Sequence, residues 1–289
     1  IGKEFYTDGP RVHDYLNELN RHTFGGKDLM TVGEMSSTTI DHCIKYTNPE
    51  RHELSSVFNF HHLKVDYENG DKWTYADYDF HQLKNILMEW QLGIHQGGGW
   101  NAIFWCNHDQ SRVVSRFGDD SNEELRQASA KSLAIALHML QGTPYIYQGE
   151  EIGMTNPHFS MMNQYRDVES LNAFQELKRK GYSEDYILKI LDQKSRDNSR
   201  TPMQWTNGEA SGFTSGQPWI DIAPNYKEVN VEQAIEDDHS VFHMYRRLID
   251  LRHNHDILTY GDITPLYMTH DQLFIYRRNY QSNSWLVVA

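Results

Sequence analysis

The sequence predicts an α/β protein: the C-terminal half of a (β/α)8 TIM barrel, followed by the start of a C-terminal antiparallel β-sandwich domain. Short apolar runs alternate with amphipathic segments from the start of the chain, which is typical of parallel βα units. Four such units are present, and four units make half of an eight-stranded barrel. Near the end of the chain the hydrophobic period changes to two, which indicates antiparallel strands. We therefore expect a barrel part at 1–256 and a β domain beginning at 257–289.

Four apolar runs are predicted to be the barrel strands, and their positions are 29–35, 54–60, 100–106 and 145–147. Helices are predicted between them from apolar residues at helical spacing and from end signals. Asp8 precedes an early proline and is expected to cap the first helix, whereas Asp79 and Gln82 form a capping-box pattern. Gly142 is the expected stop of the longest helix, at 123–141.

The second half of the chain is less regular. Residues 155–238 contain only short helical pieces, at 169–178 and 183–191, and a connection this long in a compact domain is usually functional. A clear amphipathic helix follows at 240–253. Two strands are then predicted at 272–277 and 284–289.

Composition excludes several classes of partner. The chain of 289 residues has a formal net charge of −13, which disfavours binding to nucleic acid or to an anionic membrane surface. No window is apolar over eighteen residues, so no transmembrane helix is predicted. Two cysteines, Cys43 and Cys106, are too few for an oxidised scaffold and favour reduced thiols in the cytoplasm. The chain opens on Ile1 and stops within a strand pattern, so we expect it to be cut at both ends.

Two predicted strands each deliver a carboxylate at their C-terminal end. The run TVGEM at 31–35 carries Glu34, and the run FWCNHD at 104–109 carries Asp109. With the later run GTPYIYQGEE at 142–151, this order and spacing resemble the α-amylase superfamily of glycoside hydrolases. Taken alone, Glu34 would be a surface residue and the Asn-His-Asp run a helix cap or a metal ligand. The three motifs in order favour the active-site face of a barrel.

The resemblance implies catalytic roles. Glu34 is expected to be the acid that protonates the leaving oxygen, and Asp109 the carboxylate that stabilises the cationic transition state. His108 matches a histidine that hydrogen-bonds the same sugar ring. The nucleophilic aspartate of the family has no counterpart in the sequence and is expected just before Ile1.

Further residues are implied as substrate-binding. Within the run RDNSRTPMQW at 196–205, Arg200 matches the arginine that reaches the sugar; the alternative is a tight Arg/Asp-laced loop. Arg112 is expected to orient a carboxylate or to be a plain surface arginine. The run FNFHHLKVDY at 58–67 holds His61, His62 and Lys64, three potential cations suited to a phosphate. The alternative for that run is a solvated loop.

The family resemblance thus implies a retaining α-glucosidase acting on a small phosphorylated disaccharide. The alternatives are an oligo-1,6-glucosidase or sucrose isomerase, and a non-catalytic relative that uses the barrel for binding. No cofactor is expected, and since no His-Glu-x-x-His spacing occurs, no zinc site is predicted.

Overall fold

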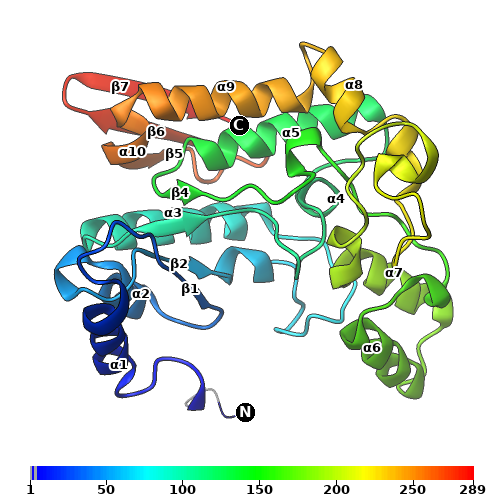
Figure 1. Ribbon diagram of the computed structural model, residues 1–289, viewed down its shortest axis with the longest axis horizontal. Coiled ribbons are helices and arrows are strands. Elements are labelled where there is room, and N and C mark those ends of the chain that lie inside the picture. The colour runs from blue at the N-terminus through cyan, green and yellow to red at the C-terminus, as the bar shows by residue number, and fades with distance from the viewer. Residues whose placement is uncertain (1, 3–4) are drawn as a thin grey trace.

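The computed structural model describes residue 2 and residues 5–289, and its central feature is a parallel sheet of four strands (Figure 1). The strands run in the order β1-β2-β3-β4. Their bounds are Val32–Met35, Ser56–Asn59, Asn101–Ile103 and Thr143–Pro144. Each neighbour pair is parallel, and Glu34 of β1 lies in register with Phe58 of β2. Sequential parallel strands joined by helices are the repeating unit of a TIM barrel.

Helices cover one face of this sheet (Figure 1). The helices of this part are α1 (Val12–Leu19), which continues into the π-helix η2 (Asn20–Phe24), α2 (Ile40–Thr47), α3 (Phe80–Gln96), α4 (Val113–Phe117) and α5 (Glu123–His138). Val57 of β2 is buried against Cys43, Trp90 and Ile94 of α2 and α3. A larger core packs the ends of the strands against α5 and α9. Burial of these apolar side chains is the main force that holds the helices on the sheet.

A separate small core holds the long excursion after β4. Its helices are α6 (Val168–Arg179) and α7 (Glu184–Lys194), and its buried residues are Phe159, Tyr165, Phe174, Leu177, Ile187, Ile190, Leu191 and Ile220. Short helices also occur within loops, both in this excursion and before it. They are η3 (Pro49–Arg51), η4 (His61–Lys64), η5 (Glu150–Ile152), η6 (Met162–Gln164), η7 (Arg196–Ser199), η8 (Glu209–Gly212) and η9 (Pro224–Lys227). The excursion is therefore a packed layer beside the sheet rather than a loose loop (Figure 1).

The last part of the chain returns to the sheet and then forms an antiparallel unit. Its elements are α8 (Val231–Glu236), α9 (Val241–Asn254), α10 (Asp256–Tyr260), β5 (Asp262–Leu266), β6 (Ile275–Tyr280) and β7 (Asn283–Val288). The three strands pair in the order β5-β6-β7. Tyr276 of β6 is fully buried and its hydroxyl donates to the carbonyl of Ala136 in α5, at 2.9 Å. The antiparallel sheet thus shares a core with the helical layer.

Most predicted elements are confirmed, with four corrections. The fourth strand lies at Thr143–Pro144, before the predicted 145–147. The helix predicted at 123–141 ends at His138, four residues before Gly142, and α3 is one residue longer than it. Strand β5 was not predicted. Asp8 does not cap α1, whose N-cap is Arg11; its backbone is left-handed (φ 51°), and its carboxylate accepts from Thr38 and Tyr46 instead.

Candidate active site

Glu34 and the residues after it lie at the carboxyl edge of the sheet. Because β1 to β4 are parallel, their C-terminal ends share one edge, where barrel enzymes build their active sites. Glu34 is the third residue of β1 and its side chain is exposed. One residue past the strand, the carbonyl of Ser36 accepts a hydrogen bond from Nζ of Lys64, at 2.7 Å. This contact joins the loops that follow β1 and β2.

Asp109 is held by two arginines at the same edge. It follows β3, and its backbone N–H donates to Oδ1 of Asn107 at 2.8 Å, which fixes a tight turn at the strand end. Its Oδ1 accepts from Nη2 of Arg200 at 2.7 Å and from Nη1 of Arg196 at 3.3 Å. About a third of its side chain (31 %) stays exposed, so the carboxylate is fixed in direction but open to a ligand.

The two arginines also share a second, buried carboxylate. Arg196 donates to Asp167 through Nε at 2.9 Å and through Nη2 at 2.6 Å, the two-pronged geometry that only arginine provides. Burial alone would raise the pKa of Asp167, but the hydrogen bonds and charge of Arg196 bring it below its usual value. Glu169 lies 3.2 Å from Nε of Arg196 and accepts from Lys72 at 2.8 Å.

Sequence reasoning did not single out Arg196, Asp167 or Glu169. Arg196 lies in the same run as Arg200, so the run itself could have drawn attention to it. Asp167 and Glu169 have no sequence signal, because they lie about thirty residues upstream and reach the site only through the fold of the excursion.

His108 is positioned through its backbone as well as its ring. Its carbonyl accepts from Nε of Arg200 at 2.7 Å, and its Nε2 lies 3.5 Å from Oδ2 of Asp109. The imidazole is mostly exposed, at 65 % of the side chain. His108, Asp109 and Arg200 are therefore brought together, as the sequence predicts, with the ring free to face a ligand.

Arg112 is placed differently from expectation. It is 2 % exposed, its Nη1 donates to the carbonyl of Gln148 at 2.5 Å, and its guanidinium lies over the ring of Tyr147. This burial corrects the alternative of a plain surface arginine, whereas the role of orienting a carboxylate stays a prediction. The physical reason is that the chain turns inward at Arg112 to start α4, so the side chain enters the core beneath the 147–149 turn.

The structure places the three side chains that were predicted to face a phosphate, His61, His62 and Lys64, in different environments. His62 is 5 % exposed, its Nε2 lies 3.0 Å from the carbonyl of Phe104, and burial lowers its pKa to about 3. It is a neutral core residue, which corrects the prediction that it binds a phosphate as a cation. His61 is half-buried and stacks on Trp90 at 4.4 Å. Of the three, Lys64 alone is exposed, at the edge that carries Glu34.

Other potential sites are few in the described part of the chain. Among residues 2 and 5–289, no group of three or more His, Cys, Asp or Glu side chains is arranged to hold a metal. Within the same residues, no helix has both the length and the apolar character needed to cross a membrane. Cys43 and Cys106 are both buried as thiols, and burial raises the pKa of each to about 12.

A parallel half-barrel sheet with carboxylates and arginines at its carboxyl edge has the layout of a barrel active site. Residues 2–261 match the family model "Alpha amylase, catalytic domain", and the chain belongs to this alpha-amylase family. It is 57 % identical, over 99 % of its length, to trehalose-6-phosphate hydrolase of Bacillus subtilis, and 46 % identical, over 100 %, to oligo-1,6-glucosidase of Parageobacillus thermoglucosidasius. The chain covers 51 % of each of these relatives, so it spans about half their length.

Solved structures of related enzymes share this fold. The crystal structure of Bacillus licheniformis trehalose-6-phosphate hydrolase superposes with a TM-score of 0.96 at 58 % identity. The match covers 99 % of this chain and 51 % of that one. The isomaltulose synthase of Erwinia rhapontici superposes with a TM-score of 0.91 at 39 % identity.

Proposed function

We propose that the protein carrying this chain hydrolyses trehalose 6-phosphate to glucose and glucose 6-phosphate, with retention of configuration. The observation that carries the proposal is the 57 % identity to a trehalose-6-phosphate hydrolase over nearly the whole chain, against 46 % to an oligo-1,6-glucosidase. The exposed Glu34 in β1 and the partly exposed carboxylate of Asp109 in the loop after β3 support it.

In the proposed mechanism Glu34 is the general acid. It donates its proton to the glycosidic oxygen as the bond breaks, and afterwards its carboxylate removes a proton from the water that releases the sugar. A retaining mechanism needs a second carboxylate about 5 Å away as the nucleophile. We propose that this aspartate comes from a barrel strand outside these 289 residues, and that the 289 residues by themselves are inactive.

Asp109 and its neighbours are proposed to bind and stabilise the reacting sugar. The transition state is cationic, so a carboxylate held in a fixed direction stabilises it without moving. Arg196 and Arg200 occupy Oδ1 of Asp109, so sugar hydroxyls are proposed to bind at Oδ2, beside the His108 ring, and at the exposed part of that ring. Arg112 acts at a distance, by supporting the turn behind the site.

Lys64 is proposed as a phosphate contact. Its ammonium lies at the edge that carries Glu34, and phosphate oxygens are strong acceptors for such a group. His61 is retained in the proposal only as a peripheral residue, because it stacks on Trp90.

The test is hydrolysis by the full-length gene product of three sugars: trehalose 6-phosphate, trehalose and isomaltose. A strong preference for the phosphorylated sugar, lost in Glu34→Gln, is the expected result. Preference for isomaltose would instead assign an oligo-1,6-glucosidase, to which the chain is also similar. Binding without cleavage of any of them would assign a non-catalytic sugar-binding role.

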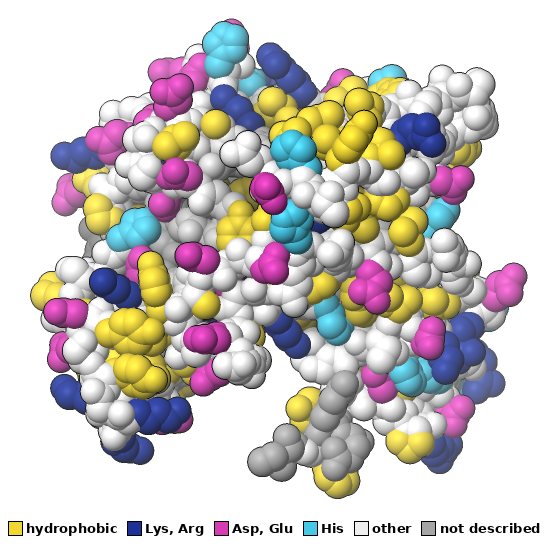
Figure 2. Space-filling model, turned by 180° about the vertical axis from the view of Figure 1, so that it is seen from behind, with side chains coloured by type: hydrophobic (Ala, Val, Ile, Leu, Met, Phe, Trp, Pro, Cys, Tyr) yellow, Lys and Arg dark blue, Asp and Glu magenta, His cyan; other side chains and the backbone are white. Residues whose placement is uncertain are grey.

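We also propose that the barrel part ends at 256 and a β domain begins at 257. The start of the three-stranded antiparallel sheet at Asp262 supports this boundary. A cytoplasmic location is proposed because both cysteines are buried thiols, as reducing compartments favour. The partner is proposed to be a small sugar and not nucleic acid, given the net charge of −13 and the acidic side chains that lie among the basic ones on the face in Figure 2.

A further inference from the structure

A buried cluster of three charges lies behind the candidate active site. Asp66 is bound through Oδ1 and Oδ2 by Arg116, at 2.8 and 3.0 Å, and through Oδ2 by Lys194, at 2.7 Å. The three side chains are only 2 %, 4 % and 1 % exposed. Lys194 also donates to the backbone carbonyl of Asp66, at 2.8 Å. The cluster therefore carries one negative and two positive charges away from water.

Each member of this cluster comes from a different segment beside the site: one loop and two helices. Asp66 is two residues past Lys64, in the loop that follows β2. Lys194 ends α7, two residues before Arg196. Arg116 lies in α4, and its Nη1 donates at 2.6 Å to the side chain of Gln110, the residue next to Asp109.

Further contacts join the same three segments. Arg116 also donates to the carbonyl of Leu63, beside Lys64. Ser111, two residues past Asp109, donates to the carbonyl of Gln193 at 2.6 Å. The segments that follow β2 and β3 and the end of α7 are thus also connected by polar contacts outside the sheet.

Burying three charges in this way is an inefficient means of stabilising the fold. Removing charges from water costs several kcal/mol per ion, and well-packed apolar side chains often stabilise a core as well. Burial lowers the pKa of Lys194 to about 8 even with Asp66 beside it, which reflects this cost. Compared with apolar side chains, the charges add a defined geometry, because a carboxylate with three short charged hydrogen bonds fixes its partners in one arrangement.

We propose that Asp66, Arg116 and Lys194 are positioning residues, which align Asp109, Arg196 and Lys64 for the glycosidase reaction. This inference rests on the proposed function of the site. The cluster is buried, so it acts on the site through the three segments that carry it.

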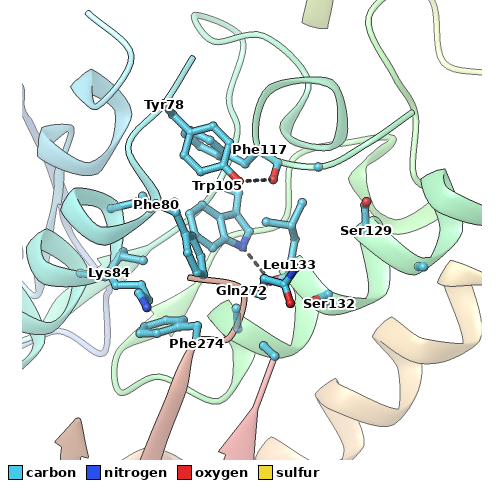
Figure 3. A pocket seen from close by; sticks show the side chains of 16 residues that line it. Tyr78, Phe80, Lys84, Trp105, Phe117, Ser129, Ser132, Leu133, Gln272 and Phe274 are labelled. Carbon is cyan, nitrogen blue, oxygen red and sulfur yellow. Dashed lines mark hydrogen bonds between the residues drawn. The ribbon is translucent and has the colours of Figure 1, made fainter. Parts of the chain in front are cut away.

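The test compares two buried lysines in the full-length protein. Lys84 is the matched control: it is 1 % exposed and donates to the carbonyls of His270 and Leu273, beside the apolar cavity of about 330 Å³ in Figure 3. In Lys194→Met we expect kcat to fall by about tenfold to a hundredfold, as a misplaced reacting group does. In Lys84→Met we expect kcat of the folded protein to stay within about twofold, although both variants lose stability.

A milder variant covers the case in which Lys194→Met does not fold. Gln110→Ala removes only the hydrogen bond between Arg116 and the Asp109 loop and leaves every buried charge paired. We expect kcat to fall severalfold with a change in Tm of a few degrees at most. Equal kcat losses in Lys194→Met and Lys84→Met, or an unchanged kcat in Gln110→Ala, would overturn the proposal.

A measurement without substrate separates this proposal from the proposed function. Hydrogen exchange of the amides at 104–112 and 195–205 is expected to speed up in Lys194→Met and Gln110→Ala, and to stay unchanged in Lys84→Met. If the wild type cleaves none of the three sugars, the proposed function fails while this exchange pattern still decides whether the cluster holds the loops. Unchanged exchange at both segments in both variants overturns the cluster's role whatever the activity.

Discussion

Arg196 donates two hydrogen bonds to Asp167, of 2.9 and 2.6 Å, while its remaining nitrogen lies 3.3 Å from Asp109. One guanidinium thus connects a carboxylate that is 3 % exposed with one that is 31 % exposed. Together with Arg200, Arg196 thus fixes the direction of the partly exposed Asp109 carboxylate, and Arg196 is itself held by the buried Asp167.

This relationship predicts that Arg196→Lys damages both stability and activity. Lysine keeps the charge but cannot make the two parallel hydrogen bonds, so Asp167 loses a partner in a buried position. We expect the free energy of unfolding to fall by about 1–3 kcal/mol and kcat/KM to fall by at least about tenfold. Urea denaturation and steady-state kinetics measure the two effects; an unchanged kcat/KM would show that Arg196 does not position Asp109.

The different burial of Lys64 and His62 predicts opposite phenotypes. Lys64→Ala removes the ammonium group of an exposed residue, so we expect the ratio of activity on trehalose 6-phosphate to that on trehalose to fall by about tenfold, with little change in Tm. His62→Leu removes a buried neutral ring, so we expect lower stability and the same ratio. A loss of phosphate preference in His62→Leu would contradict this assignment.

The ion pairs of His158 are predicted to stabilise the folded protein at neutral pH but not at high pH. Its Nε2 lies 3.1 Å from Asp120 and its Nδ1 3.1 Å from Asp192, and the hydrogen bonds to these two carboxylates raise its pKa from 6.5 to about 10. A raised folded pKa means that the contribution is complete below about pH 6.5 and is lost as the pH rises towards 10. Half of the ring is exposed, so solvent reduces the contribution to about 1 kcal/mol or less.

The check is chemical denaturation of the wild type and His158→Gln between pH 6 and pH 10. We expect the wild type to be more stable at pH 6 and the difference to vanish near pH 10. A difference that stays constant over this range would mean that the charge of His158 contributes nothing.

The buried side chain of Glu150 predicts a second loss of folding stability with rising pH. Its cause is burial rather than an ion pair. It is 2 % exposed, and burial raises its pKa from 4.5 to about 8, although the hydroxyl of Tyr245 donates to it at 2.9 Å. The folded protein holds a proton there that the unfolded chain releases, so stability falls as the pH rises from about 4.5 through 8.

Glu150→Gln removes the titrating group while keeping its shape. We expect the variant to gain stability over the wild type with rising pH, by on the order of a few kcal/mol at pH 9. Parallel denaturation profiles at pH 5 and pH 9 would contradict the assignment of a neutral carboxyl group. A thermal melt at each pH serves as the control for global unfolding.

The sequence predicted those strands and helices whose spacing and end signals lie in neighbouring residues. The amphipathic helix at 240–253 is found as α9, with Ser240 as its cap, because spacing and capping are both written in neighbouring residues. Strand β5 escaped prediction because Pro265 interrupts its pattern, and the proline is tolerated only because β5 lies at the edge of its sheet. Edge position is a property of the assembled sheet and leaves no mark in the sequence.

The same division holds for the site. Sequence patterns were enough to predict a half-barrel and to select Glu34, His108, Asp109 and Arg200 as candidate residues, because strand ends and short motifs are local. The burial of Arg112 and His62, and the contacts that bring Arg196 and Asp167 to the site, were found only in the folded structure. Burial and long-range ion pairs depend on which segments pack together, and residues thirty to ninety positions apart carry no local record of that packing.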